Sequence, residues 1–314
     1  MEYKKRLTCI LSIIGALAVV YIASFIFDPE FSGKRNAAYV WLDSKLAGRI
    51  AKIVIDGNED SVEIVKKNNK WFVLRDDAEY PARQLRIEDF IGIFTSKKAW
   101  PVRSTNASSH ERLGIDKNSA TRITLYGENS TLLDLLLGSE DVTGREIYIR
   151  KYDRNEVRSG ENLFASYLTG SATAWFNLKL IPESEDGKVA VDSVQRLSVY
   201  NKQSTQVFSK KNRTWTVSGF QLSNPDQASI DGYVREILNL EGDNFLPLIT
   251  DDPSYYEGSL VLELGNGSIK TIRVTNADES GSRIAFVEGS DYGYSLAPWA
   301  AQRLFRNARD FETQ

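Results

Sequence analysis

The chain has 314 residues, 26% of them charged and 11% aromatic, a composition that is typical of folded domains and excludes a disordered protein. Its net charge of −3 does not fit a nucleic-acid-binding surface, so no nucleic-acid partner is expected. The single cysteine, Cys9, excludes an intrachain disulfide and a cysteine zinc site. The length is sufficient for two domains of ordinary size and an anchoring segment.

The N-terminus joins a basic stub, residues 1–6, to an uncharged apolar run over residues 7–27. A helix of that length spans about 30 Å, the hydrocarbon thickness of a bilayer. We therefore predict a transmembrane signal anchor at 7–27, in contact with membrane lipid, and a connector over 28–49. The basic stub is expected to stay in the cytoplasm, with the C-terminal body in the periplasm or outside. The alternatives are a cleaved signal peptide and a helix buried in a soluble protein.

One stretch of the sequence occurs twice. Residues Ile50–Val73 align without a gap to Val194–Val217, 144 positions later. The identical positions are Lys66, Lys67, Asn68, Trp71 and Val73, which recur as Lys210, Lys211, Asn212, Trp215 and Val217. We interpret this as a tandem duplication, with a first repeat at 50–169, a joint at 170–193 and a second repeat at 194–308. The alternative is two ordinary hairpins that share a lysine-rich turn.

The first repeat shows strand-like and helical patterns in a clear order. Alternating apolar residues predict three short antiparallel strands over Ile50–Val73, and Tyr80-Pro81-Ala82 is expected to break the sheet. Apolar residues at helical spacing then predict an amphipathic helix of about 13 residues. Three more strands and a short closing helix follow, at 122–126, 132–137, 146–151 and 162–168.

The second repeat shows the same order of patterns. Its helix is expected over Ile230–Leu238, one residue off the earlier offset. Three strands and a closing helix follow, at 258–264, 268–275, 283–287 and 298–305. The predicted fold class is therefore α+β: an N-terminal transmembrane helix, then two tandem repeats, each a mostly antiparallel sheet with one or two helices.

No residue set in the sequence fits a known catalytic or metal site. His110 is the only histidine, and no G-x-S-x-G turn accompanies it, so a solvated loop histidine is favoured over a catalytic triad. The run Asp56–Asp60 begins like a calcium loop, but Ser61 and Lys67 replace the required glycine and glutamate. We expect no catalytic, cofactor-binding or metal-binding residue, no cofactor, and a protein that is not an enzyme.

Adjacent carboxylates keep a hydrolase as a remote alternative. Glycosidases need two carboxylates that face one site, whereas sequence neighbours in a strand point to opposite faces. We therefore interpret these residues as solvated. The pairs are Asp76-Asp77, Glu88-Asp89, Glu140-Asp141 and Asp251-Asp252.

Three tryptophans are the candidate binding surface. Trp71, Trp175 and Trp215 could together floor a groove for a sugar, because flat aromatic rings suit that role. The competing interpretation is core packing, since Trp71 and Trp215 occupy equivalent places in the two repeats.

Several phrases in order carry a family resemblance. After the N-terminal run come Trp71, Tyr80-Pro81-Ala82, Leu113-Gly114-Ile115-Asp116, Leu137-Gly138-Ser139, Ile147-Tyr148-Ile149-Arg150, Val157 and Trp175 with Lys179-Leu180. The chain resembles the bacterial domain-of-unknown-function family 4340. The second copy departs from the pattern, with Asp251-Asp252-Pro253-Ser254-Tyr255 in place of the Leu-Gly-Ile-Asp phrase.

The resemblance implies a membrane-anchored protein of the bacterial cytoplasmic (inner) membrane with an extracytoplasmic body. Members are often encoded beside ABC-type transporters and gliding-motility-like auxiliary subunits. We therefore expect an accessory or scaffold protein of an ABC-type transporter or a motility-related envelope complex, with an ABC-type permease or auxiliary subunit as partner. The alternative is a glycan- or peptide-binding module that uses an exposed sheet edge or a cleft between the repeats.

Overall fold

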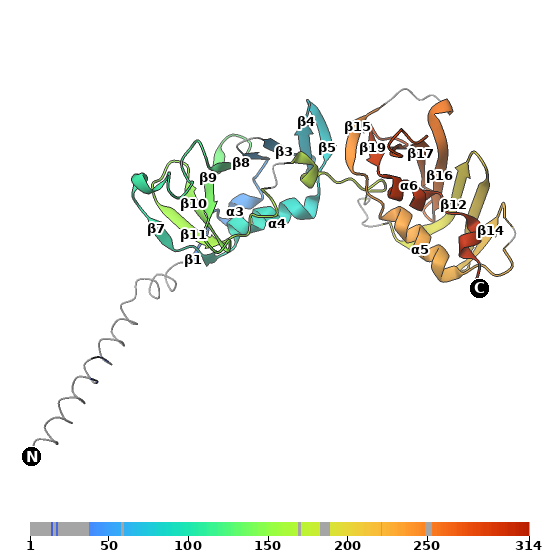
Figure 1. Ribbon diagram of the computed structural model, residues 1–314, viewed down its shortest axis with the longest axis horizontal. Coiled ribbons are helices and arrows are strands. Elements are labelled where there is room, and N and C mark those ends of the chain that lie inside the picture. Colours follow the sequence, from blue (N-terminus) through green and yellow to red (C-terminus); the bar gives the residue numbers. More distant parts are fainter. Residues whose placement is uncertain are drawn as a thin grey trace, which may run out of the picture. The chain divides into compact units, whose positions relative to one another are not determined.

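The computed structural model separates the chain into two compact units, Met1–Trp175 and Phe176–Gln314, which we call unit 1 and unit 2 (Figure 1). Each unit is described by itself. The structure describes residues 14, 17, 38–57, 60–168, 171–182, 189–220, 222–248 and 253–313.

Unit 1 is built on a nine-stranded sheet with the order β5-β4-β3-β2-β8-β9-β10-β11-β7, in which all neighbouring strands are antiparallel. A separate two-stranded sheet pairs β1 with β6. The first five strands of the nine-stranded sheet in chain order are β2 (Lys52–Asp56), β3 (Ser61–Lys67), β4 (Lys70–Arg75), β5 (Ala78–Pro81) and β7 (Val102–Ser104). The others are β8 (Thr121–Tyr126), β9 (Thr131–Glu140), β10 (Glu146–Lys151) and β11 (Val157–Glu161). Strands β1 and β6 are Ala38–Tyr39 and Lys98–Ala99.

The core of unit 1 follows from the alternation of its strands. Each of β2, β3 and β4 buries two alternate residues, because successive side chains of a strand point to opposite faces. Helix α4 (Gln84–Thr95) buries Ile87, Phe90, Ile93 and Phe94, and it lies beside the sheet in Figure 1. Helix α3 (Ser44–Ala47) is a single turn ahead of β2.

A second, smaller core lies against Leu136 of β9. Leu136 packs with Ile115, Ala120 and Val157, which are all buried. Two glycines bring the preceding loop close to β9. Gly114 has a φ of 60°, and a Cβ on Gly138 would lie 2.5 Å from the Leu113 carbonyl oxygen. The Leu-Gly-Ile-Asp phrase is therefore a packing device of unit 1.

A buried arginine fixes the same loop. The Arg150 side chain is 4% exposed, and its guanidinium donates hydrogen bonds to four backbone carbonyls. Burial lowers the pKa of Arg150, while the nearby charge of Asp116 acts in the opposite direction. The carbonyls belong to Ile115, Lys151, Tyr152 and Arg154.

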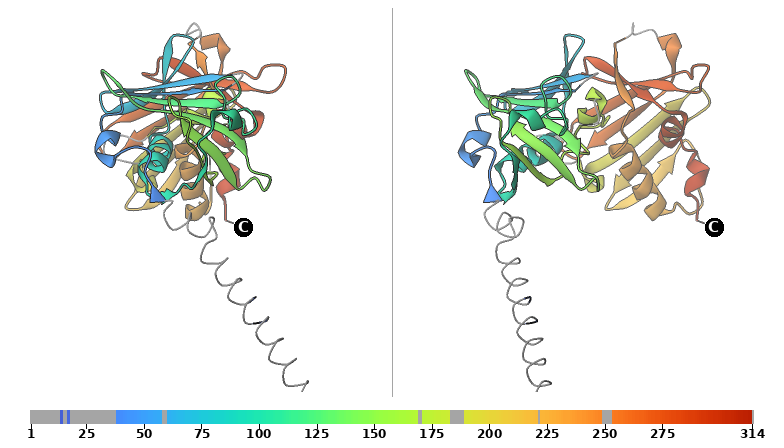
Figure 2. Two further views of the ribbon diagram at one scale, coloured as in Figure 1. Left: turned by 90° about the vertical axis from the view of Figure 1, so that its left-hand side faces the viewer. Right: turned by 60° about the vertical axis from the view of Figure 1, so that its left-hand side comes forward.

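Unit 2 is built on an eight-stranded antiparallel sheet with the order β14-β13-β12-β16-β17-β18-β19-β15. Helices α5 (Gln227–Leu238) and α6 (Pro298–Leu304) pack against each other beside it (Figure 2). The first four strands are β12 (Val194–Asn201), β13 (Thr205–Lys211), β14 (Thr214–Ser218) and β15 (Asn244–Pro247). The others are β16 (Tyr256–Leu264), β17 (Ile269–Thr275), β18 (Arg283–Val287) and β19 (Tyr292–Leu296).

The two sheets have the same strand order. Strand β14 corresponds to β4, β12 to β2 and β16 to β8. With this correspondence, every pair of neighbouring strands in unit 2 has a counterpart in unit 1, and unit 1 has β5 in addition. The register is conserved as well, because Lys66 faces Trp71 and Lys210 faces Trp215. Both turns place two residues at positive φ, Asn68 with Asn69 and Asn212 with Arg213, which is the backbone of a two-residue hairpin.

The predicted α+β class was wrong, because both units are mostly β. The expected helix over 162–168 is absent, and this segment forms turns without a regular helix. Short strands with polar residues, glycine or proline carry too little alternation to be recognised. The strands that the pattern missed were β1, β5, β6, β7, β11, β15 and β19.

The predicted transmembrane helix is also not supported. Among the described residues, no helix has both the length and the apolar character needed to cross a membrane. The predicted span of residues 7–27 lies outside the described residues, apart from Ile14 and Leu17.

Candidate functional site

The two units share a hydrogen-bonded clamp at the start of their main helices. In unit 1, the Gln84 side chain accepts from the Trp71 N–H (2.9 Å) and donates to the Trp71 carbonyl (3.1 Å). In unit 2, Gln227 makes the same two bonds to Trp215, at 2.6 Å and 3.1 Å. A side-chain amide thus satisfies both polar groups of one residue on the outer side of β4 and of β14.

Beyond this clamp, the outer side of β4 is covered by β5. A tight turn with Asp76 and Asp77 at positive φ returns the chain, and Val73 then pairs with Tyr80. The covered Val73 side chain is fully buried, and Tyr80 is 7% exposed.

On the corresponding side of β14, the described residues form no such covering strand. Because the Trp215 backbone groups face Gln227, those of Val217, two residues further on, face the same way. No described strand pairs with this side of β14. The chain instead leaves the sheet, and Pro225 pairs with Glu312. Val217, unlike Val73, is only half-buried.

The segment between the strand and the helix differs in length between the two units. Trp71 and Trp215 are 144 positions apart, whereas Gln84 and Gln227 are 143 apart, so one residue is missing between strand and helix. Gly219, at a φ of 84°, follows β14 at the position of Arg75, which in unit 1 directly precedes the Asp76-Asp77 turn. The described residues of this shorter segment do not form a strand beside β14.

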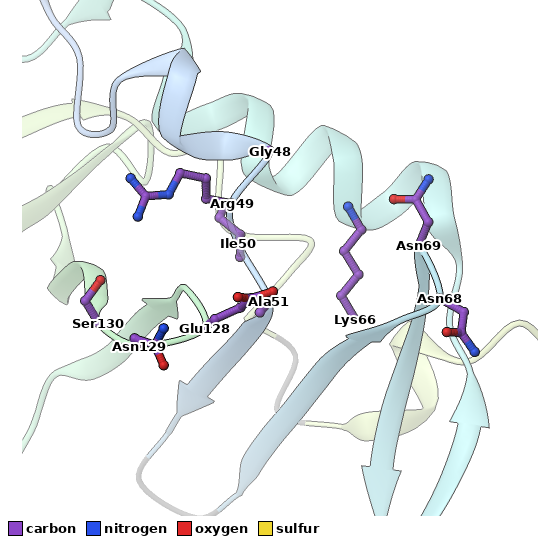
Figure 3. A pocket seen from close by; sticks show the side chains of 10 residues that line it. All are labelled: Gly48, Arg49, Ile50, Ala51, Lys66, Asn68, Asn69, Glu128, Asn129 and Ser130. Carbon is purple, nitrogen blue, oxygen red and sulfur yellow. The ribbon is translucent and has the colours of Figure 1, made fainter.

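A polar pocket of about 500 Å³ is the second distinctive feature, and it lies in unit 1 (Figure 3). The segment Gly48–Ala51 runs through its centre, with the β8–β9 turn on one side and Lys66 with the β3–β4 turn on the other. The remaining lining residues are Asn68, Asn69, Glu128, Asn129 and Ser130.

The equivalent lysine of unit 2 lies in a different environment. Lys210 Nζ lies 3.1 Å from the Asp192 carboxylate and 3.2 Å from that of Asp231, and its side chain is 8% exposed. Burial alone would raise the pKa of Asp231, but hydrogen bonds from the Trp215 indole and Lys210 bring this pKa below its usual value. The positive charge of Lys210 is thus balanced by two carboxylates of the same unit.

The predicted tryptophan groove is absent, because all three rings are in the hydrophobic cores. Trp71 is 5% exposed, and Trp175 and Trp215 are each 1% exposed. Trp175 packs edge-on against Phe90, whereas in unit 2 Phe311 packs in a tilted arrangement against Tyr233. The core-packing interpretation therefore describes all three residues.

The other singled-out residues serve local structure. His110 Nε2 lies 3.1 Å from the Asn155 carbonyl oxygen and holds two loops together. Asp141 accepts hydrogen bonds from the Glu146 backbone N–H, the Thr143 hydroxyl and the Arg145 backbone N–H, which lower its pKa. Glu88 and Asp89 are exposed on α4, while Asp251 and Asp252 lie outside the described residues. Within the described part of the chain, no cluster of three or more His, Cys, Asp or Glu side chains is arranged to hold a metal ion.

A buried polar cluster that the sequence pattern missed also has a structural role. Ser159, which is fully buried, donates to the Glu146 carboxylate at 2.7 Å and accepts from Arg103 Nε at 2.7 Å. The hydrogen bond from Ser159, then that from Arg103, lowers the pKa of Glu146. With its oxygen engaged on both sides, Ser159 is held as a link between strands.

The described residues define a protein of two antiparallel sheets with the same strand order, with a strand edge that no described strand covers in one unit and a polar pocket in the other. The chain belongs to the DUF4340 family, a domain of unknown function whose family model matches residues 71–258. No curated protein matches the sequence at a significant level.

Proposed function

We propose that the chain is a non-catalytic accessory or scaffold protein, and that β14 binds an extended segment of its protein partner. The observation that carries this proposal is the uncovered outer side of β14, at the place where β5 covers β4. Adding a strand to such an edge uses backbone hydrogen bonds for affinity and alternate side chains for specificity.

Strand β5 indicates what the bound segment must look like. It runs antiparallel to β4, and its residue opposite Val73 is the large, buried Tyr80. A partner segment opposite Val217 should likewise place a bulky apolar side chain over that half-buried residue. The family resemblance supports a partner in the bacterial cell envelope, an ABC-type permease or auxiliary subunit.

A proline at position 217 tests strand addition. The Val217 N–H faces away from β13, so Val217→Pro removes a donor to the partner while leaving the β13–β14 ladder in place. We expect roughly tenfold weaker capture of the partner, since a strand partner loses a backbone hydrogen bond and meets the proline ring. The measurement is quantitative co-purification of the full chain from its own cells in mild detergent.

The matched control is Thr216→Lys, which changes an exposed side chain of the same strand. It should capture the partner as the unchanged chain does. Retention of the partner by Val217→Pro would rule out strand addition, and repeated isolation of the unchanged chain without any partner would rule out the accessory role.

A graft provides the missing strand within the chain. Replacing residues 219–225 by residues 75–82 restores the length and the Asp76-Asp77 turn of unit 1. The grafted strand should occupy the outer side of β14 and prevent partner capture. Undiminished capture by a correctly folded graft would contradict the proposal.

A further inference from the structure

The pocket of unit 1 has the size of a small-molecule site. Its volume of about 500 Å³ falls within the range of roughly 300–1,000 Å³ for ligand pockets. Its lining is polar, with two cationic side chains, Arg49 and Lys66, one carboxylate, Glu128, and several amides and hydroxyls. This feature belongs to unit 1 and is independent of the proposed strand addition at β14.

Unit 2 carries larger, polar residues at two of the corresponding positions. Continuing the 144-residue offset, Asp192 stands where unit 1 has Gly48, and Gln195 stands where it has Ala51. Asp192 provides the carboxylate that pairs with Lys210 at 3.1 Å. Asp192 and Gln195 are both exposed, so unit 2 has a surface carboxylate and a surface amide where unit 1 has two small residues.

Lys66 is left without the counterion that its counterpart has. It lies 5.5 Å from the centre of the Trp71 ring, as Lys210 lies 5.2 Å from that of Trp215. Among the described residues, no carboxylate forms an ion pair with Lys66. Glu88 stands where α5 has Asp231, yet it is exposed and leaves Lys66 unpaired.

We propose that this pocket binds a carboxylate ligand, and that Lys66 pairs with the ligand carboxylate at the place that Asp192 takes in unit 2. A charge-assisted hydrogen bond of this kind is stronger than a neutral one, so it discriminates an acid from its uncharged analogue.

The rest of the lining defines the chemical class of the ligand. Asn68, Asn69, Asn129 and Ser130 offer donors and acceptors that match hydroxyl groups. Glu128 also accepts from hydroxyls and disfavours a second acidic group on the ligand. The class that fits is a hydroxyl-rich acid with one carboxylate, and D-glucuronate is a simple probe of that class.

Two substitutions at position 48, to Asp and to Asn, differ in charge but have nearly the same shape. Gly48 has ordinary helical dihedral angles, φ −64° and ψ −16°, and a Cβ added there meets no atom within 4 Å. Gly48→Asp should place a carboxylate near Lys66, as Asp192 lies near Lys210, whereas Gly48→Asn has the same size and no charge. Both variants should fold as the unchanged chain does.

The experiment is a titration of the full chain with D-glucuronate and, separately, with D-glucose. Binding is measured by calorimetry or nuclear magnetic resonance. We expect glucuronate to bind and glucose to bind at least about tenfold more weakly, the size of one charge-assisted hydrogen bond. Gly48→Asp and Lys66→Gln should each weaken glucuronate binding by about the same factor, and Gly48→Asn by less than about threefold.

Three results would overturn the proposal. They are absence of glucuronate binding to the unchanged chain, equal binding of glucose, and full binding by Gly48→Asp. Because the site lies in unit 1, Val217→Pro should leave glucuronate binding unchanged, so a failure here is separable from a failure of partner capture.

Discussion

Units 1 and 2 share one sheet order but differ in how two parts of that sheet are completed. Both keep the glutamine clamp on the outer strand and the lysine stacked over the tryptophan ring. Unit 1 covers its outer strand with β5 and leaves its lysine unpaired, whereas unit 2 leaves the strand uncovered and pairs the lysine internally. The comparison shows that the two units share the hydrogen bonds to the tryptophan backbone. They differ in the cover of the neighbouring strand edge and in the partner of the lysine.

The buried arginine of unit 1 is expected to give the largest effect. Arg150→Met leaves four backbone carbonyls without their charged donor, and this should reduce the stability of unit 1 by about 3 kcal/mol. Hydrogen exchange read by mass spectrometry should show faster opening of unit 1 peptides and unchanged unit 2 peptides. The control is Arg154→Met, an exposed side chain; equal effects of the two changes would show that Arg150 does not hold the loop.

Gly138 comes next, because any side chain there meets backbone atoms. Gly138→Ala would place Cβ at 2.5 Å from the Leu113 oxygen and 2.9 Å from the Gly114 oxygen, and should cost about 2 kcal/mol through forced backbone shifts. Gly92→Ala, in α4 with no atom near its Cβ, should instead stabilise unit 1 by up to about 1 kcal/mol. Chemical denaturation checks both, and a neutral Gly138→Ala would contradict the close packing of this loop.

The glutamine clamps sharpen the comparison, because both units should respond alike. Gln84→Met and Gln227→Met each remove hydrogen bonds to a tryptophan backbone, so each should destabilise its own unit by about 2 kcal/mol. Hydrogen exchange of each unit gives the two values. A large loss in one unit and none in the other would show that the clamps are not equivalent.

The ion pairs of Lys210 predict a small pH effect confined to unit 2. The folded-state pKa of Asp231 is depressed, so its stabilising contribution is present above the unfolded pKa of about 3.9 and is lost as pH falls through the folded value. Asp231→Asn should therefore flatten the acid dependence of unit 2. Glu88→Gln in unit 1 is the matched control, and an identical change in both units would contradict this assignment.

The sequence predicted the parts of the fold whose pattern is strong. The duplicated stretch forms β2–β4 and β12–β14, and the helical spacing of Ile87, Phe90 and Phe94 corresponds to α4. The α+β class failed because β5 contains Pro81 and β11 contains Gly160, so neither shows clear alternation. Proline is compatible with β5 because this strand lies at the edge of the sheet.

The candidate surfaces left weaker signals in the sequence. Tryptophan content could not distinguish a groove from a core, since the burial of Trp175 depends on its contact with Phe90. The sequence contained one signal for the pocket. Extending the aligned stretch by two residues places Gly48 opposite Asp192. The uncovered edge was marked by the change of offset from 144 to 143, although only the structure shows that the missing residue removes a strand.

The most direct test of the comparison is native-state hydrogen exchange of two equivalent amides, Val73 and Val217. Val73 pairs with Tyr80 of β5, and its amide should exchange only when unit 1 opens. The Val217 amide should exchange orders of magnitude faster in the isolated chain, because no strand covers it, and should become protected when the partner is bound. Equal protection of the two amides in the isolated chain would show that the edge of β14 is already covered, and would contradict the proposed mode of partner binding.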